Sequence, residues 1–322
     1  MSNTEGPLIL AITGGVGGAK LALGLADKLA PSQLQILVNT ADDFQHLGLY
    51  ISPDVDTLLY TLSGRSNQAL GWGLESESWH TMDALAELGG DTWFRLGDKD
   101  IATHLWRTQA LADGKNLIEV VGLLAKSMGI GCGVHPMSAD PVRTMVFTDE
   151  GELPFQHYFV RRQCEPSVSG FRFAGMESAT PNPAIMQMLA AKSPAAIIIC
   201  PSNPFVSVDP ILQLPGVWHA MRDSGAPVIA VSPIVAGMAI KGPAAKMMKE
   251  LKLPVSALAV ASHYSERYPG LLSGFVIDSS DVKLADEIAA TGVTVATTNT
   301  VMKTRQDKQT LASFVLAMAG QL

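Results

Sequence analysis

Residues 8–21 decide the fold, and they read Leu8-Ile-Leu-Ala-Ile-Thr-Gly14-Gly-Val-Gly-Gly-Ala-Lys20-Leu21. A short apolar run typical of a buried strand leads into a glycine-rich loop, and the loop leads into an amphipathic helix. Residues without side chains let the backbone approach a diphosphate closely, and the helix directs its first N–H groups and its positive dipole end at the anion. We therefore expect a phosphate-binding loop formed by Gly14, Gly15, Gly17 and Gly18; the alternative is an ordinary tight turn.

The loop differs from two familiar nucleotide-binding motifs. A dinucleotide loop has Gly-x-Gly-x-x-Gly, and counting from Gly15 places Lys20 where the last glycine belongs, which disfavours a nicotinamide-dependent oxidoreductase. A P-loop ends in Gly-Lys-Ser/Thr, whereas Leu21 offers no hydroxyl to Mg²⁺. We expect Lys20 to neutralise the diphosphate, and any metal ligands have to come from elsewhere in the chain.

The composition argues against several classes of protein. The 322 residues carry a formal net charge of −7 and contain no basic run, which argues against nucleic acid as a partner. No stretch approaches the roughly 20 apolar residues of a membrane span, and the N-terminus does not resemble a secretory signal. The three cysteines, Cys132, Cys164 and Cys200, are widely spaced and fit reduced thiols. We expect a cytoplasmic protein with no membrane partner.

Apolar strands alternate with helical stretches along most of the chain. This alternation predicts one α/β domain over 1–322, built on a doubly wound, mostly parallel, Rossmann-like sheet. Between 131 and 180 short alternating runs surround the turn Asp149-Glu150-Gly151, which predicts a small antiparallel β insertion. The predicted sheet strands after the first are Leu34–Val38, Ala195–Cys200, Pro227–Ser232, Ala257–Ala261, Gly274–Asp278 and Val293–Ala296; those of the insertion are Val142–Thr148, Leu153–Arg161 and Gly170–Ala174; helices include Pro183–Ala191, Ala244–Leu251 and Val282–Ala290.

Polar loops follow the predicted parallel strands. Ligands of a doubly wound sheet bind beyond the carboxyl ends of its strands, so these loops and the glycine loop should line one cleft. Ser202 and Asn203 lie between two prolines that hold them rigidly, and Ser232 follows the next strand. Lys241 precedes a further helix and is a candidate for neutralising a diphosphate; the alternative is an exposed lysine beside an ordinary helix start.

Four carboxylates fall within fifteen positions with no Lys or Arg among them: Asp42, Asp43, Asp54 and Asp56. Such crowding is unfavourable unless a cation lies among the carboxylates. Mg²⁺ takes one or two carboxylates together with phosphate oxygens. We assign Mg²⁺ to Asp42, Asp43 and Asp54. The alternative is helix capping, with Asp54 as the N-cap of a helix through Leu62 and Asp56 in its first turn.

An aromatic and cationic cluster occupies residues 93–108. Arg95 and Arg107 offer planar contacts to anions, and the tryptophans offer stacking surfaces, which together suit a flat heterocycle. In this segment Asp98 or Asp100 is expected to cap the helix that follows. The alternative to a binding role is that the aromatic side chains Trp93, Phe94 and Trp106 belong to the core.

Taken in order, these motifs resemble the 2-phospho-L-lactate transferase family of coenzyme F-420 biosynthesis. Further matching segments are Leu96–His104, Pro136–Asp140 and Lys241–Pro243, so the resemblance covers nearly the whole chain. It implies a Mg²⁺-dependent transferase that commonly forms a homodimer. The implied reaction moves a phospho-organic acid (2-phospholactate, phosphoenolpyruvate or 3-phosphoglycerate) from a guanylyl diphospho donor to the 5′-hydroxyl of the deazaflavin Fo, with release of GMP.

The resemblance also implies roles for individual residues. Asp56 and Arg95 match residues that contact the deazaflavin, and we expect Asp54 and Asp56 to be the catalytic carboxylates, with Asp56 orienting the acceptor hydroxyl. A nucleotide-sugar-binding regulator of a related, gluconeogenesis-factor-like family is the alternative, because it shares the glycine loop and the Ser-Asn-Pro element without this reaction. The expected nucleotide-binding residues are Gly14, Gly15, Gly17, Gly18, Lys20, Ser202, Asn203, Ser232 and Lys241.

Overall fold

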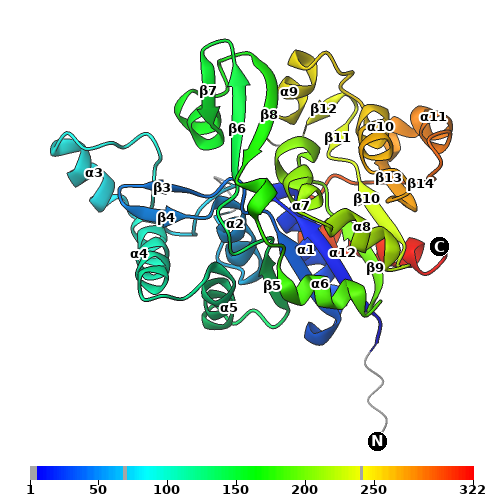
Figure 1. Ribbon diagram of the computed structural model, residues 1–322, viewed down its shortest axis with the longest axis horizontal. Helices are drawn as coiled ribbons and strands as arrows, with labels where there is room; N and C mark the ends of the chain where they lie inside the picture. The colour runs from blue at the N-terminus through cyan, green and yellow to red at the C-terminus, as the bar shows by residue number, and fades with distance from the viewer. Residues whose placement is uncertain (1–5, 68–70, 240–241) are drawn as a thin grey trace, which may run out of the picture.

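The computed structural model describes residues 6–67, 71–239 and 242–322. Its centre is a seven-stranded sheet in which every pairing is parallel (Figure 1). The predicted doubly wound α/β class is therefore confirmed. Across the sheet the strands are β14 (Thr294–Thr298), β13 (Gly274–Asp278), β10 (Val228–Val231), β9 (Pro194–Ile199), β1 (Leu8–Thr13), β2 (Leu34–Val38) and β5 (Gly133–Pro136).

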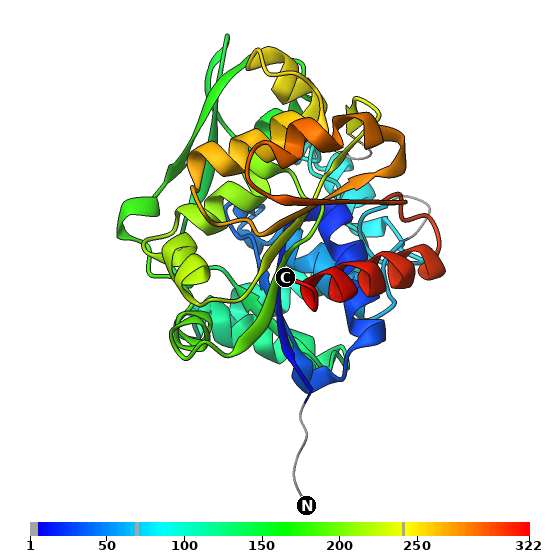
Figure 2. The same ribbon diagram turned by 90° about the vertical axis from the view of Figure 1, so that its right-hand side faces the viewer.

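Helices cover both faces of the sheet (Figure 2), which explains why its strands are apolar without alternation. In β1, Leu10 and Ile12 pack into the core on one face, while Ile9 and Ala11 pack into the core on the other. The first face carries α6 (Pro183–Ala190), α7 (Asp209–Gln213), α8 (Val217–Asp223), α9 (Ala244–Glu250) and α10 (Ala257–Arg267); the second carries α1 (Gly15–Lys28), α2 (Pro53–Leu62), α5 (Leu117–Ser127) and α12 (Arg305–Ala319).

The order of the strands reverses beside β1. After β1 the chain moves outward through β2 and β5 on one side, then returns to β9 on the other side and continues to β14. The loops that follow β1 and β9 therefore diverge from the same edge of the sheet and leave a crevice between them, which is where open α/β sheets bind ligands.

Two smaller groups of elements extend from the sheet (Figure 1). The hairpin of β3 (Phe44–His46) and β4 (Leu49–Ile51) projects on one side together with α3 (His80–Glu87) and α4 (Asp98–Ala112). The predicted antiparallel insertion is a three-stranded sheet with β6 (Arg143–Thr148) between its two neighbours. The neighbours are β7 (Gly151–Pro154) and β8 (Val168–Ala174); the remaining short elements are β11 (Ile234–Val235), β12 (Met238–Ala239) and α11 (Ala285–Ala289).

Three sequence-based predictions of local structure are wrong. The insertion does not begin at 131, because β5 joins the edge of the central sheet by pairing with β2. The strand expected over Leu153–Arg161 ends at Pro154, and His157–Arg161 is a turn of π-helix. Ala257–Ala261 is the start of α10 rather than a strand, because a short apolar run has no period that separates the two structures.

Helices α3 and α4 cap each other. Asp98 accepts hydrogen bonds from the backbone N–H groups of His80 and Thr81, at 3.1 and 3.0 Å. Glu77 accepts from the backbone N–H groups of Lys99 and Asp100, at 2.8 and 2.9 Å. Asp98 therefore caps α3 and not, as expected, the helix in which it lies.

Candidate active site

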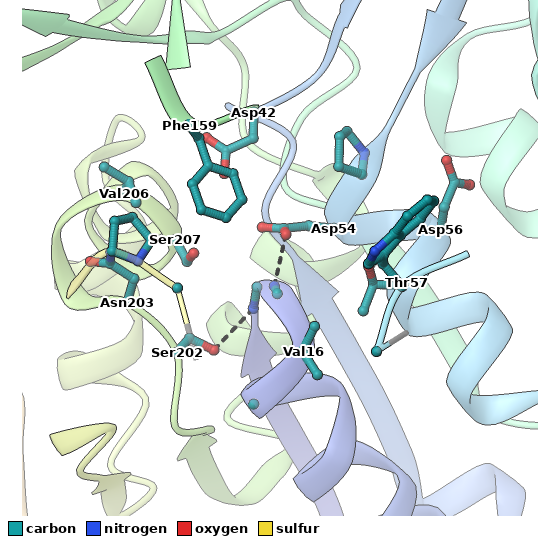
Figure 3. A pocket seen from close by; sticks show the side chains of 18 of the residues that line it. Val16, Asp42, Asp54, Asp56, Thr57, Phe159, Ser202, Asn203, Val206 and Ser207 are labelled. Atoms are coloured by element: carbon teal, nitrogen blue, oxygen red, sulfur yellow. Dashed lines mark hydrogen bonds between the residues drawn. The ribbon is translucent and has the colours of Figure 1, made fainter. Parts of the chain in front are cut away.

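A cavity of about 610 Å³ lies beyond the carboxyl ends of the central strands. Its walls come from the glycine loop after β1, the start of α2, the Ser-Asn-Pro loop after β9, and aromatic side chains from 72 to 94 and from 155 to 159. Figure 3 shows Asp54, Ser202 and Val16 meeting around the glycine loop. The cleft predicted from separate loops is therefore one continuous space.

The glycine loop is held against the Ser-Asn-Pro loop. The N–H of Gly14 donates to Ser202 Oγ at 3.1 Å (Figure 3), so Ser202 supports the loop directly. Gly15 has φ +66°, in the left-handed region that favours glycine. A Cβ at Gly17 would lie 2.4 Å from the carbonyl oxygen of Pro201. Val16 and Gly17 line the cavity within the first turn of α1, where N–H groups have no partner inside the helix.

Asp54 reaches the glycine loop and not the start of its own helix. Its Oδ1 accepts from the Gly15 N–H at 2.8 Å (Figure 3). Its Oδ2 accepts from Asn39 Nδ2 at 2.9 Å. The N-cap of α2 is Ser52, without a capping side-chain bond. The capping alternative for Asp54 is therefore wrong.

Asp42 and Asp54 face the cavity as a buried acidic pair. Burial, followed by the neighbouring Asp54 charge, raises the pKa of Asp42 well above its usual range, and Asp42 Oδ1 has no hydrogen-bond partner within the described residues. Burial also raises the pKa of Asp54, to about 6, against the hydrogen bonds from Asn39 and Gly15. Two carboxylates held in this way are poorly stabilised without a cation.

Asp43, the third residue of the expected metal set, lies behind the cavity. It is absent from the cavity wall, its Oδ2 accepts from Ser52 Oγ at 2.8 Å, and burial raises its pKa to about 7. Within the described parts of the chain no three acidic, His or Cys side chains form a ready ligand set. The structure therefore brings Asp42 and Asp54 together and leaves Asp43 apart from them.

Asp56 lines the cavity and also forms a buried ion pair. Arg107, which is fully buried on α4, contacts both carboxylate oxygens of Asp56, with Nη1 at 3.1 Å from Oδ2. Arg107 itself does not reach the cavity wall, so the prediction that it contacts an anionic ligand is wrong. The anion that it binds is the Asp56 carboxylate. The ion pair joins α4 to α2.

His104 continues this network on the cavity side. Arg107 Nη1 lies 3.1 Å from His104 Nδ1, and since arginine only donates, Nδ1 is the acceptor in this contact. His104 Nε2 lies 3.3 Å from Asp100 Oδ1, which also accepts from the Tyr60 hydroxyl at 2.6 Å. All four residues other than Arg107 (Asp56, Tyr60, Asp100 and His104) line the cavity.

Aromatic side chains form a second part of the wall. Trp93 and Phe94 line the cavity and also pack together, with ring centroids 5.6 Å apart. Arg95 lines it too and stacks over Trp79, with Cζ 4.3 Å from the ring centroid. Trp106 is 44% exposed, so the core alternative is wrong for that residue.

The remaining expected nucleotide contacts lie on the same wall. Lys20, Asn203 and Ser232 line the cavity. Lys20 Nζ donates to the carbonyl oxygen of Met302 at 3.1 Å, and the Asn203 side chain accepts from the Phe205 N–H at 3.0 Å. Gly18 lies inside the loop, against Thr13 and Ser202, and Lys241 lies outside the described residues.

Sequence reasoning missed several wall residues. Tyr60 lies four positions after Asp56 on α2, and His104 lies four positions after Asp100 on α4, so two facing polar pairs at helical spacing were available as a signal. The π-helical turn and the loop before it contribute Gln156 and Phe159, for which the predicted strand gave no signal. Ser207 also lines the cavity.

Comparison with known proteins now decides the family. A family model described as 2-phospho-L-lactate transferase CofD matches residues 9–311. The chain belongs to this family. The resemblance found in the sequence motifs is confirmed, and the CofD match includes every loop of the cavity described above.

Relatives of this CofD chain carry two kinds of name. A phosphoenolpyruvate transferase of Streptomyces griseus is 36% identical over 290 residues, covering 88% of this chain and 90% of the relative. A 2-phospho-L-lactate transferase of Methanosarcina mazei is 35% identical over 310 residues, covering 96% and 99%. One of the same name from Methanopyrus kandleri is 36% identical over 318 residues, covering 98% of each. The chain is therefore a transferase of the CofD type.

The CofD fold is also found in a solved structure. A member of the UPF0052 family from Bacillus halodurans superposes with a TM-score of 0.66 over 98% of this chain and 100% of that one, at 14% identity. This likeness concerns the fold alone. Within the described residues, no helix is both long and apolar enough to span a membrane.

Proposed function

We propose that this chain transfers a phospho-organic acid from a guanylyl diphospho donor to the 5′-hydroxyl of the deazaflavin Fo and releases GMP. One observation carries the proposal: a phosphate-binding loop and an aromatic, arginine-bearing wall line a single cavity. The loop suits the diphosphate, and the wall suits a flat tricycle. Relatives named for 2-phospho-L-lactate and phosphoenolpyruvate support an acid of three carbons as the transferred group.

The residues of the cavity fit a magnesium ion. Asp42 Oδ1 is buried without a partner, and Asp54 lies beside it against the glycine loop. Mg²⁺ prefers one or two carboxylates together with substrate phosphates and waters, so Asp42 and Asp54 are sufficient as protein ligands. When bound there, Mg²⁺ neutralises charge on the diphosphate.

The chain's own residues supply positioning, which is most of what phosphoryl transfer requires. The first-turn N–H groups of α1 and Lys20 bind the diphosphate. Asp56 accepts a hydrogen bond from the acceptor hydroxyl and takes its proton as the new oxygen–phosphorus bond forms. The bond between the same phosphorus and the GMP oxygen breaks, and GMP leaves with that oxygen. Arg95 and the aromatic wall hold the tricycle.

The experiment mixes the protein with Fo, Mg²⁺ and synthetic guanylyl donors of 2-phospholactate, phosphoenolpyruvate and 3-phosphoglycerate, each in a separate reaction. Mass spectrometry should detect Fo heavier by one phospho-acid, together with GMP in equal amount, for at least one donor. Reactions without Fo and with Asp56→Asn are the controls. Absence of both products with every donor contradicts the proposal, and tight binding of a nucleotide sugar in the same preparation would then favour a regulator.

A further inference from the structure

A small second cavity opens from the first beside α1. It has a volume of about 120 Å³, and its wall includes Lys20, Lys303 and Lys308; we call it the lysine hollow. Val16 and Lys20, one helical turn apart on α1, line both the lysine hollow and the main cavity, as does Thr57 of α2. A group bound at the glycine loop can therefore extend into the hollow without leaving the site.

The two cavities differ in charge. Four carboxylates, of Asp42, Asp54, Asp56 and Asp100, line the main cavity, where Lys20 and Arg95 are the lysine and arginine side chains within the described residues. The lysine hollow has three lysines, and no Asp or Glu belongs to its described wall. In a chain of net charge −7 this concentration of positive charge marks a place for an anion.

Lys308 is the residue that most requires an anion. The residue is only 6% exposed, and none of the ion pairs among the described residues includes its ammonium. The carboxylate that acts on it, Asp27, already accepts from Arg305 at 2.6 and 2.8 Å and from Gln309. Enclosure in the hollow limits the hydration of this ammonium, and the one carboxylate acting on it is shared with Arg305, so a bound anion would stabilise it.

Size and position narrow the choice of anion. A volume of about 120 Å³ is several times the ~10–15 Å³ that a cavity needs to hold one water molecule, so the hollow takes a group of a few atoms. The first-turn N–H groups of α1 already provide the place for a diphosphate. The next anionic group along the donor of the proposed function is the carboxylate of its organic acid.

We propose that the lysine hollow binds the carboxylate of the donor's phospho-acid, while the glycine loop binds the diphosphate. This inference rests on the proposed function and deepens it, because it assigns the recognition of the acid to Lys308, with Lys303 and Lys20 beside it. A donor without a carboxylate would leave the hollow unfilled and Lys308 without a counter-ion. The hollow thus selects carboxylic acids over neutral groups of the same size.

The test measures donor binding by calorimetry, with no need for turnover. The two ligands are the guanylyl diphospho ester of lactate and the matching ethyl ester of GDP, which lacks the carboxylate. Lys308→Met should weaken the lactate donor about 10- to 100-fold, the loss expected for one charge-assisted bond, and change the ethyl ester less than about twofold. Lys308→Arg, which keeps the charge, should restore most of the affinity. Lys283→Met, at an exposed position outside both cavities, is the matched control.

Three results overturn the inference. Equal weakening of both ligands by Lys308→Met means that Lys308 supports the fold or the diphosphate. Unchanged binding of the lactate donor means that Lys308 does not contact it. Binding of inorganic phosphate that Lys308→Met abolishes means that the hollow is a phosphate site. Carboxylate-dependent binding without any transfer to Fo would instead contradict the proposed function and leave this inference standing.

Discussion

The guanidinium of Arg107 holds both carboxylate oxygens of Asp56, and both residues are buried. The pair links α4, which follows the aromatic residues Trp93 and Phe94, to α2, whose Asp54 bonds the glycine loop. The direction in which Asp56 presents its remaining lone pairs is thus set from outside the cavity. In the proposed reaction, Arg107 acts on the acceptor hydroxyl only through Asp56.

Arg107→Met should lower the free energy of unfolding by about 3–5 kcal/mol, because it leaves the Asp56 carboxylate buried and uncompensated. Arg222→Met is the matched control, since Arg222 pairs with Asp223 at 2.8 Å on the surface, and such exposed pairs contribute at most about 1 kcal/mol. Urea unfolding monitored by circular dichroism measures both values. Equal, small losses would show that the buried pair is not needed for stability.

The stability of the metal-free protein should fall as pH rises from about 4 to about 7. Burial raises the pKa of Asp54 to about 6 and that of Asp43 to about 7, above the ordinary value of 3.8. The folded state therefore holds these protons more tightly than the unfolded state does. The resulting stabilisation is complete below about pH 4 and is lost as the pH rises past the pKa values of the folded state. Each carboxyl accounts for roughly 3–4 kcal/mol at 1.36 kcal/mol per unit.

Urea unfolding across this pH range measures the effect. Asp43→Asn removes one of the three buried carboxyls with a raised pKa, the others being Asp42 and Asp54, and should make the fall between pH 4 and 7 shallower, with higher stability than the unmodified chain at pH 8. A stability that rises steadily over the same pH range would contradict the assignment of buried carboxyls with raised pKa values.

Magnesium should offset part of this loss at pH 8. At a Mg²⁺ concentration of 100 times its Kd, binding adds about 2.7 kcal/mol to the free energy of unfolding, and chelation removes it. Because Asp42 and Asp54 face the cavity and Asp43 does not, Asp42→Asn and Asp54→Asn should abolish this gain while Asp43→Asn retains it. Thermal melting with and without Mg²⁺ separates the three variants; a loss in Asp43→Asn alone would place the ion elsewhere.

Gly17→Ala should disrupt donor binding, because the new Cβ would lie 2.4 Å from the backbone oxygen of Pro201 and force the two loops apart. Gly122→Ala is the matched control: it lies inside α5 with nothing within 4 Å of the new Cβ, so it should stabilise the protein by about 0.5–1 kcal/mol. Calorimetric titration with GDP and thermal melting measure both. Unchanged GDP affinity in Gly17→Ala would remove the loop contact from the binding site.

Arg95→Ala should raise the KM for Fo about 10-fold while the KM for the donor changes little. The guanidinium lines the cavity and is held flat against Trp79, so it presents a preorganised planar surface to the tricycle. Steady-state kinetics with each substrate varied in turn checks the prediction. An increase confined to the donor KM would assign Arg95 to the nucleotide instead.

The sequence was informative where function depends on local geometry. The glycine loop, the Ser-Asn-Pro loop and the acidic segment each follow a buried strand, and the parallel sheet brings such ends to one edge, so their meeting could be predicted. The hydrogen-bond and ion-pair partners of individual side chains could not be predicted. Asp54 bonds Gly15 across 39 positions and Asp56 pairs with Arg107 across 51, and no local pattern encodes such a distance.

Errors in secondary structure had the same origin. Ala257–Ala261 is apolar and small enough for a strand or a helix, and only its place against the sheet decides for α10. Residues 157–161 were expected to be the end of a strand but wind into a π-helical turn, which carries Phe159 to the cavity wall.

The crossed caps of Glu77 and Asp98 tie the beginnings of α3 and α4 to each other, with Arg95 in the segment between them. Glu77, just before α3, accepts from the first N–H groups of α4. Asp98, in the first turn of α4, accepts from the first N–H groups of α3. Neither helix can fray at its beginning without releasing its neighbour. Thermal fluctuations of the two helix starts are therefore coupled rather than independent. Arg95 lies in a segment that is anchored by these caps instead of in a loose loop.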